Sequence, residues 1–170
     1  MTIRTEKNGD ELLIREINLA AFGQSAEADV IDALRKNCKE FISLVALDDE
    51  KIVGHILFTP AFIESASKII YGMGLAPMAV LPEYQNKGIG SNLVTAGLDR
   101  MKKLNIPFII VLGHPDYYPR FGFEIASKYK INCEYEDVPY EAFMILILDK
   151  NKMKNVKGTA KYRPEFSSAI

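Results

Sequence analysis

Cysteine and histidine are scarce in this sequence, and tryptophan is absent. The 170 residues include two cysteines and two histidines. Cys38 and Cys133 match no paired metal-ligand spacing and are too few for a disulfide scaffold, and the histidines are too scattered to complete a ligand cluster. We therefore expect reduced thiols and no metal site.

The sequence also lacks an excess of charge of either sign and a long apolar run. Its 21 basic and 22 acidic residues give a formal net charge of −1, which offers no general attraction to nucleic acid or to an anionic membrane. No apolar run reaches the roughly 18 residues of a membrane span, and the N-terminus carries charges where a signal peptide needs an apolar segment. These absences predict a cytoplasmic protein that binds neither nucleic acid nor membrane.

The composition is that of an ordinary folded domain. Apolar residues make up 48% of the chain and charged residues 25%, as in typical soluble globular proteins. A chain of this length can bury one core without disulfides or metals. We place a single domain at residues 1–150 and treat residues 151–170 as its C-terminal extension. The one basic cluster, from Lys150 to Lys161, is typical of a solvated tail rather than a binding patch.

The first part of the chain has the apolar spacing of a short strand and two helices. A strand over residues 2–7 is followed by a helix over residues 11–22, with Asp10 as its N-cap and Gly23 as its C-cap. A second helix ends before Asn37. The residues expected on the buried faces and at the second N-cap are Leu13, Ile14, Ile17 and Ala21 on the first helix, and Ser25, Val30, Ile31 and Leu34 on the second.

The middle of the chain alternates strands with one helix, so we expect a mixed α/β fold. Two β-rich segments flank a polar turn as an antiparallel hairpin, and a further strand contains Gly72, Gly74 and Pro77, which signal a bulge, an edge or a close backbone approach. An amphipathic helix and a strand buried on both faces complete a βαβ unit. The expected strands cover residues 41–47, 52–58, 69–80 and 107–112, the helix 93–104, and the βαβ unit about 74–113.

The last part of the chain has weaker signals. A loop contains Tyr117 and Tyr118, and β-like segments follow at residues 123–131 and 143–148. The second of these segments is apolar enough to extend the sheet of a second copy, so the sequence leaves a homodimer open.

The loop "VLPEYQNKGIGSNLV", residues 80–94, has the chemistry of an anion site. A glycine-rich turn that enters a helix gathers free backbone N–H groups at the positive end of the helix dipole. Gly88 and Gly90 allow a close approach, and Lys87 adds a cation. Gln85, Asn86 and Ser91 add neutral hydrogen-bonding groups. A pyrophosphate fits this set, although two glycines before a helix can also serve the turn alone.

Two common phosphate loops do not fit the sequence. A Walker loop needs a glycine five positions before Gly88 and a lysine after it, and the chain has neither. A dinucleotide fingerprint needs a third glycine where Leu93 stands, and it belongs after the first strand of its domain. Both nucleotide-binding classes are therefore disfavoured.

The remaining pattern, Gln-x-x-Gly-x-Gly from Gln85 to Gly90 preceded by Val80-x-Pro82, resembles the acyl-coenzyme A loop of the GNAT superfamily of N-acetyltransferases. The segment "HPDYYPRFGFEI", residues 114–125, supports the resemblance, because Tyr118 stands four residues before the Gly122-Phe123 pair, as in that family. The resemblance implies a GNAT-like acyl-CoA N-acyltransferase fold, in which helices flank a central mixed β-sheet. One departure is that prolines around Tyr118 should break or shorten the helix found there in relatives.

The resemblance also implies an activity and a set of site residues. The activity is transfer of an acetyl group from acetyl-CoA, the co-substrate, to a primary amine by direct attack through a tetrahedral intermediate. Tyr118 matches the position that protonates the departing thiolate, with Tyr117 as the neighbour that could replace it. The implied coenzyme-binding residues are Met78, Ala79 and Val80, through strand amides of Met78 and Val80, and Gln85, Asn86, Lys87, Gly88, Ile89, Gly90 and Ser91, through the loop.

Three questions stay open at this stage. The base that removes the amine proton could be Glu83 or His114, and neither is specified; His55, inside an apolar strand, is more typical of a satisfied, half-buried histidine than of a base. The acceptor could be a small-molecule amine or an amine of a peptide or protein. The chain could instead be a non-catalytic module that binds or senses acyl-CoA, or an unrelated α/β protein that binds a phosphate ligand.

Overall fold

The computed structural model describes residues 1–169, which form two compact units. The first unit comprises Met1–Phe58, Ala76–Asp99 and the segment from Pro164 onward. The second unit comprises Thr59–Leu75 and Arg100–Arg163. Two long strands, β3 (Lys51–Glu64) and β4 (Ile69–Val80), contribute residues to both units.

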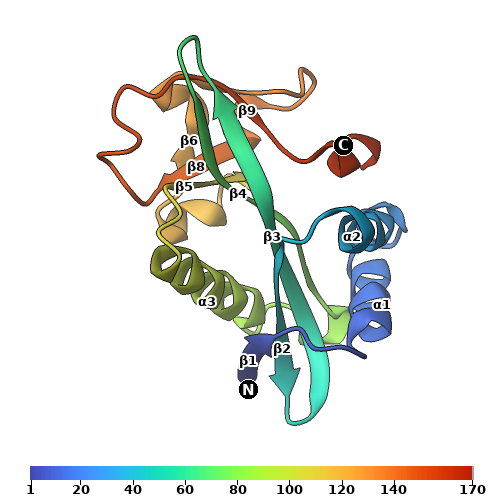
Figure 1. Ribbon diagram of the computed structural model, residues 1–170. Coiled ribbons are helices and arrows are strands. Elements are labelled where there is room, and N and C mark those ends of the chain that lie inside the picture. Colours follow the sequence, from blue (N-terminus) through green and yellow to red (C-terminus); the bar gives the residue numbers. More distant parts are fainter. Residues whose placement is uncertain (170) are drawn as a thin grey trace. The chain divides into compact units, whose positions relative to one another are not determined.

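Residues 1–169 contain nine strands in one mixed sheet and three α-helices (Figure 1). The hydrogen-bonded strand order is β1-β2-β3-β4-β5-β8-β6, and β9 pairs with β3 and β7. The β4–β5 and β7–β9 pairs are parallel. The mixed α/β sheet predicted from the sequence is confirmed. The other elements are β1 (Thr2–Thr5), α1 (Glu11–Phe22), α2 (Ala26–Asn37), β2 (Ile42–Asp48), α3 (Ile89–Lys103), β5 (Phe108–Leu112), β6 (Glu124–Ile125), β7 (Ile131–Cys133), β8 (Phe143–Ile147) and β9 (Gly158–Lys161).

Helix α1 has the predicted bounds, but its buried face differs from the predicted one. Ile14 and Ile17 are buried, whereas Leu13 is 46% exposed. Asn18, rather than Leu13, is the third residue of this helix that is buried, and it is fully buried. A buried amide is tolerated where it is hydrogen-bonded, and Asn18 Nδ2 donates to the backbone oxygen of Ile14 at 2.9 Å. The expectation for Leu13 was therefore wrong, because an apolar side chain at helical spacing need not face the core.

The predicted caps of α1 lie where expected, but the N-cap side chain acts differently. Asp10 precedes the helix and makes no capping hydrogen bond with its side chain. Its carboxylate instead accepts the backbone amide of Lys7 and pairs with Arg4 at 2.6 Å. Arg4 is the main reason that the pKa of Asp10 is lowered. Gly23 ends the helix in the left-handed conformation, with φ of 69°.

A polar network in the core of the first unit joins α1 to β2 and β3. His55 and Asn18 are fully buried, and Ser43 is 3% exposed. Asn18 Nδ2 lies 3.3 Å from Nδ1 of His55, and Nε2 of His55 lies 3.0 Å from Ser43 Oγ. Because an amide nitrogen only donates, Nδ1 accepts and the ring proton lies on Nε2. Burial, with a smaller effect of Arg35, lowers the pKa of His55 to about 3, so the imidazole is neutral.

This neutral histidine should make the folded state sensitive to acid. An unfolded chain binds a proton on His55 near its ordinary pKa, whereas the folded chain does not until the pH approaches 3. The unfolded state therefore binds more protons below about pH 6.5, and the free energy of unfolding should fall by about 2 kcal/mol between pH 7 and pH 5. Urea unfolding at the two pH values measures this, and His55→Gln is the control. An equal fall in the control would contradict the assignment.

Helix α3 lies close against strand β3 within the first unit. A Cβ built on Gly54 would be 3.0 Å from Leu93 Cδ1 and 3.2 Å from Ile89 Cγ2. On the helix side, a Cβ on Gly97 would overlap the ring of Phe58. Two glycines thus let the helix and the strand approach closely, and this approach fixes where the N-terminus of α3 lies on the strand.

The second unit contains the parallel pair that completes the predicted βαβ connection. Met73–Leu75 of β4 pair with Ile109–Val111 of β5, and the residues of β5 from Phe108 to Val111 are fully buried. Close approaches explain Gly72 and Gly74 in β4: a Cβ on Gly72 would be 2.6 Å from the backbone oxygen of Phe108. A close backbone approach was one of the explanations that the sequence left open for these glycines, and it is confirmed.

The late strands depart from the sequence-based expectation. The β-like segment predicted over residues 123–131 is two short strands, β6 and β7, separated by a 3-10 helix over Ala126–Tyr129. Strand β8, which the sequence offered as an edge for a second copy, pairs with β5 along its length and with β6 at Met144 and Ile145. Strand β6 thus covers the second edge of β8 at Met144 and Ile145, and the homodimer that the sequence leaves open stays a prediction.

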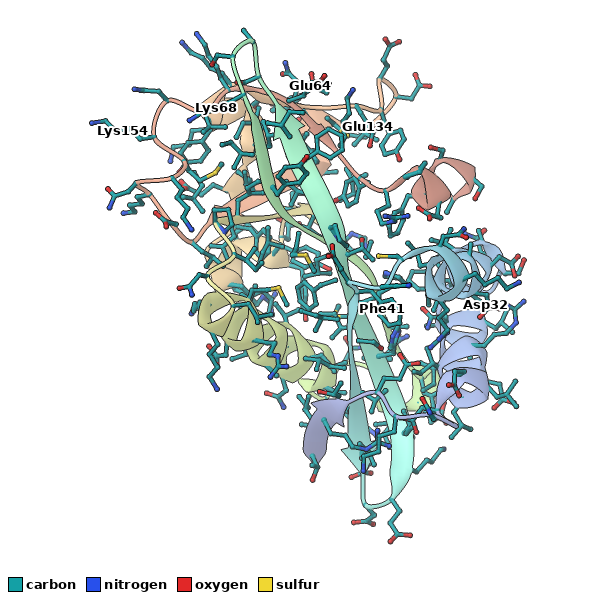
Figure 2. The ribbon with its side chains drawn as sticks, in the orientation of Figure 1. Asp32, Phe41, Glu64, Lys68, Glu134 and Lys154 are labelled. Carbon is teal, nitrogen blue, oxygen red and sulfur yellow. The ribbon has the colours of Figure 1, made fainter. Side chains whose placement is uncertain are left out.

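The C-terminal lysine cluster is not a free tail. Met153 and Val156 are buried between its lysines, and Lys161 lies in β9 and pairs with Glu64 of β3 at 2.6 Å. Lys154 is exposed, and Figure 2 shows its side chain extending away from the ribbon. The solvated character of the cluster is thus confirmed for the exposed Lys150, Lys152, Lys154 and Lys157 but not for Lys161. The single domain over residues 1–150 with an extension over 151–170 stays a prediction.

Candidate acetyl-CoA site

The segment between β4 and α3 is a compact turn, and two residues near its end have a left-handed backbone conformation. Gln85 Nε2 donates to the backbone oxygen of Val80 at 3.0 Å, so this side chain ties the loop back to the end of β4. Asn86 has φ of 59° and Gly88 has φ of 81°. Glycine and asparagine are the residues that adopt this conformation most readily. No atom lies within 4 Å of a Cβ built on Gly88, so the space beside it is open.

The first turn of α3 presents backbone amides with no acidic side chain beside them. The Gly88 oxygen accepts from the Asn92 amide at 3.0 Å, which is the first helical bond, so the amides of Ile89 and Gly90 precede it. The first turns of α1 and α2 contain carboxylates, whereas the first turn of α3 contains none. The N-terminus of α3 is therefore the one of the three that is best suited to an external anion.

Lys87 is the cation predicted beside this turn, and its ammonium group is held at the loop. Its Nζ donates to the backbone oxygen of Glu83 at 2.9 Å and lies 5.2 Å from the centre of the Tyr84 ring. Lys51 lies 5.0 Å from the centre of the same ring and 3.5 Å from the Glu83 carboxylate. The loop thus has a positive charge within it before any ligand binds.

The predicted strand amides can be placed by the alternation of β4. The Leu81 amide donates to the backbone oxygen of Val53 on β3 at 2.9 Å. Backbone groups of successive strand residues point to opposite edges, so the amides of Met78 and Val80 point to the edge away from β3. The Val80 oxygen, which lies on that edge, accepts from Gln85. Ala79 between them is buried. The residues predicted to bind the coenzyme therefore lie together in the first unit.

Tyr118 lies in the second unit, at the start of a 3-10 helix over Tyr118–Phe121. This short helix confirms that the prolines near Tyr118 shorten the element. The Tyr118 ring packs edge-on against Tyr117 at 5.1 Å and Phe123 at 5.6 Å between centres. Burial, followed by the neighbouring Tyr117, raises the pKa of the Tyr118 hydroxyl. Its phenol is therefore protonated across the neutral range.

Two of the three candidate bases lie at the surface, and the third is inaccessible. Glu83 and His114 are exposed, and Glu83 pairs with Lys51. His55 is the satisfied histidine that the sequence favours, fully buried rather than half-buried, and its lone pair on Nδ1 is occupied by Asn18. His55 is therefore inaccessible to an amine substrate. The structure does not distinguish between Glu83 and His114 as the base.

The sequence analysis did not single out Asn18 or Tyr162. Asn18 binds the buried histidine, and the ring of Tyr162 lies 2.6 Å from a Cβ built on Gly74. The one local signal for Tyr162 was Gly74 itself, since a glycine inside a strand marks a close approach without naming the residue that approaches.

Residues 1–169 contain no group of three or more His, Cys, Asp or Glu side chains arranged to hold a metal ion. Cys38 and Cys133 are free. Among the helices of the same residues, none has the length and apolar character needed to span a membrane.

Comparison with known proteins identifies the family. The sequence model described as "Acetyltransferase (GNAT) domain" matches residues 2–126. The chain is 39% identical over 125 residues to YjhQ of Escherichia coli, an uncharacterized N-acetyltransferase, over 72% of this chain and 69% of YjhQ. It is 30% identical over 168 residues to YhbS of Escherichia coli, also an uncharacterized N-acetyltransferase, over 98% of this chain and 99% of YhbS.

Two crystal structures are similar along nearly the whole chain. The structure of YhbS from Escherichia coli in complex with CoA has a TM-score of 0.90 at 30% identity, over 98% of this chain and 91% of that chain. A GNAT family acetyltransferase from Brucella melitensis in complex with acetyl-CoA has a TM-score of 0.76 at 32% identity, over 97% of each chain. The family motifs, the mixed sheet and these similarities agree, and the chain therefore belongs to the GNAT family of acetyltransferases and is an acyltransferase.

Proposed function

We propose that the chain transfers the acetyl group of acetyl-CoA to a primary amine of a small molecule, a peptide or a protein. The observation that carries the proposal is the N-terminus of α3, where Gly88 in a left-handed conformation leads into a first helical turn that has no acidic side chain. The two similar structures, which hold CoA and acetyl-CoA, support the choice of ligand. The free thiols of Cys38 and Cys133 are in keeping with the cytoplasm, where we place the reaction.

The loop and the strand have separate tasks in this proposal. The amides of Gly88, Ile89, Gly90 and Ser91 bind the diphosphate, and Lys87 balances part of its charge. Gln85 and Asn86 hold the turn in shape. The amides of Met78 and Val80, on either side of Ala79, bind the pantetheine arm and polarise the thioester carbonyl. Donors that are already in place at the start of the reaction need no reorganisation as charge develops on the carbonyl oxygen.

Tyr118 completes the transfer as a general acid. The amine nitrogen attacks the thioester carbon, the resulting tetrahedral intermediate collapses, the carbon–sulfur bond breaks, and the thiolate takes the Tyr118 proton. The amine proton leaves to solvent, and solvent reprotonates the phenolate. A phenol of pKa about 10 is a weaker acid than a thiol of about 8.5, so this step is uphill by about 2 kcal/mol before the burial of Tyr118 is counted. Proximity within the bound state must offset this difference.

Ligand specificity is tested by thermal unfolding with acetyl-CoA, ATP and NAD. At a hundred times its dissociation constant, a specific ligand should stabilise the protein by about 2.7 kcal/mol. We expect this stabilisation with acetyl-CoA and CoA but not with ATP or NAD at the same concentration. Equal stabilisation by ATP would instead support a general phosphate site.

Turnover is tested by following thiol release from acetyl-CoA with a panel of primary amines. Release that depends on the amine, with the acetylated amine detected by mass spectrometry, is the expected result. Binding of acetyl-CoA without release for any amine class would favour the non-catalytic binding module instead. The same panel identifies the acceptor, since the amine with the highest kcat/KM defines the substrate class.

A further inference from the structure

We propose that the second unit contains a binding site for a small organic ammonium ion, in a cavity beside β7 and β8. The cavity has a volume of about 210 Å³, and all of its lining residues belong to the second unit. Pockets for drug-sized ligands have volumes of about 300–1,000 Å³, so this cavity suits a smaller molecule but holds more than a single water. None of its lining residues belongs to the coenzyme site or to the aromatic cluster around Tyr118.

The innermost lining residues of the cavity are apolar and lie on the sheet. Ile131 of β7 is fully buried, and Phe143 of β8 is 3% exposed. Strand pairing holds both residues, because Ile131 pairs with Gly158 of β9 and Phe143 pairs with Leu112 of β5. The half-buried Val138 adds a further apolar wall. The hydrocarbon part of a ligand would therefore be removed from water against a fixed apolar surface, which is favourable.

Two tyrosine rings supply the aromatic part of the lining. Tyr135 is half-buried, and its ring is stacked on that of Tyr162, with centres 6.5 Å apart and planes 25° apart. Tyr162 is itself held, because its backbone amide donates at 2.6 Å to Oε1 of Glu134, which is labelled in Figure 2. Tyr140 is 64% exposed, at the start of a 3-10 helix over Tyr140–Ala142. An aromatic ring attracts a cation that lies over its face, so both rings suit a positively charged ligand.

The charge at the cavity is negative. Glu136 is the one charged side chain among the lining residues, and no salt bridge within residues 1–169 involves it. The segment over residues 134–141 contains four carboxylates and neither lysine nor arginine. A carboxylate accepts hydrogen bonds from an ammonium group and repels an anion. The lining thus selects a cation, and its apolar and aromatic part selects one with a hydrocarbon body.

Two kinds of molecule carry this chemistry. One is the amine acceptor of the proposed function, since a primary amine with a pKa near that of lysine, about 10.4, is protonated at neutral pH. The other is an organic cation that is not acetylated. The same lining groups would bind either one.

The binding test uses butylammonium, which combines an ammonium group with a short hydrocarbon chain. NMR chemical-shift titration of the full chain without acetyl-CoA gives its dissociation constant, so this result is independent of turnover. Butanol is the uncharged analogue, and butyrate is the anionic one. We expect butylammonium to bind about tenfold more tightly than butanol, since one hydrogen bond to a charged group supplies such a factor, and we expect no shift with butyrate.

Substitutions at the rim of the cavity identify the site. Glu136→Gln should weaken butylammonium binding by about three- to tenfold, because it removes the charge and keeps the size. Tyr140→Leu should weaken it by about two- to fivefold through loss of the aromatic face, and Tyr140→Phe should bind as the wild type does. Both residues are exposed, so these variants should fold. The matched control is Asp137→Asn, which removes the same charge from the adjacent residue outside the lining and should change the affinity by less than about twofold.

Tetramethylammonium, which has no N–H bond to acetylate, separates the two kinds of ligand. If it competes with the amine in thiol release, the cavity binds the acceptor; if it shifts the resonances of the cavity without changing turnover, the cavity binds a separate cation. The inference would be overturned by no binding of butylammonium, by equal binding of butanol, or by an affinity that is unchanged in Glu136→Gln or equally reduced in Asp137→Asn. A chain that binds butylammonium but releases no thiol with any amine counts against the proposed function alone.

Discussion

Replacing Tyr118 with phenylalanine is expected to lower kcat for acetyl transfer by about 10²-fold or more, while KM for acetyl-CoA stays within about twofold. The Tyr118 ring packs against Phe123 and Tyr117, and a phenylalanine ring keeps these contacts. Only the proton donor is removed. Because burial raises the pKa of Tyr118, the wild type should also keep its activity through the mildly alkaline range without a decline due to this group.

The matched control is Tyr117→Phe, which removes the adjacent hydroxyl from the same aromatic cluster. It should change kcat by no more than about twofold, since Tyr117 is not the proposed acid. Stopped-flow thiol detection over a range of pH gives kcat and KM for both variants. If the large loss occurred in Tyr117→Phe and not in Tyr118→Phe, the acid would have to be reassigned to Tyr117.

Replacing Gly88 with aspartate should weaken acetyl-CoA binding by about 10- to 100-fold relative to Gly88→Asn, because a carboxylate would then face the diphosphate at the N-terminus of α3. The two variants have the same shape, and both adopt a left-handed φ more readily than other side chains, so the backbone cost at φ of 81° is matched. The space beside Gly88 is open, so neither side chain should clash.

The same substitution should have the opposite effect on stability. A carboxylate at the N-terminus of a helix interacts favourably with its dipole, so Gly88→Asp without ligand should unfold at a temperature equal to or above that of Gly88→Asn. Titration calorimetry and thermal unfolding measure the two effects separately. High salt should reduce the difference in affinity, since part of it is a screened repulsion. Equal affinity of the two variants would place the diphosphate elsewhere.

The order of helices and strands was largely predictable because each element depends on local spacing. The bounds of α1 and β4 agree with those expected, and Gly23 ends α1 as predicted. The loop Gln85–Ser91 was readable as a glycine-rich turn that enters a helix, because its glycines and the apolar spacing after them are local signals. That this turn binds a diphosphate stays a prediction. Short late strands were harder: two- and three-residue strands such as β6 and β7 have no periodicity to detect.

Buried polar groups and aromatic contacts were not predictable, because they join residues far apart in the chain. The apolar spacing of α1 favoured Leu13 over Asn18 for the buried face. Spacing along one helix cannot show that His55, on another element, is a hydrogen-bond partner for Asn18 in the core. Likewise, nothing near Tyr162 in the sequence connects it with Gly74.

The amino-acid sequence by itself determined the family motifs, the order of elements and the glycine-rich turn before α3, because backbone conformation and apolar periodicity are properties of neighbouring residues. Only the tertiary structure decided that His55 is a neutral core residue and that Tyr162 lies against Gly74, because such contacts arise when distant segments share one packed interior.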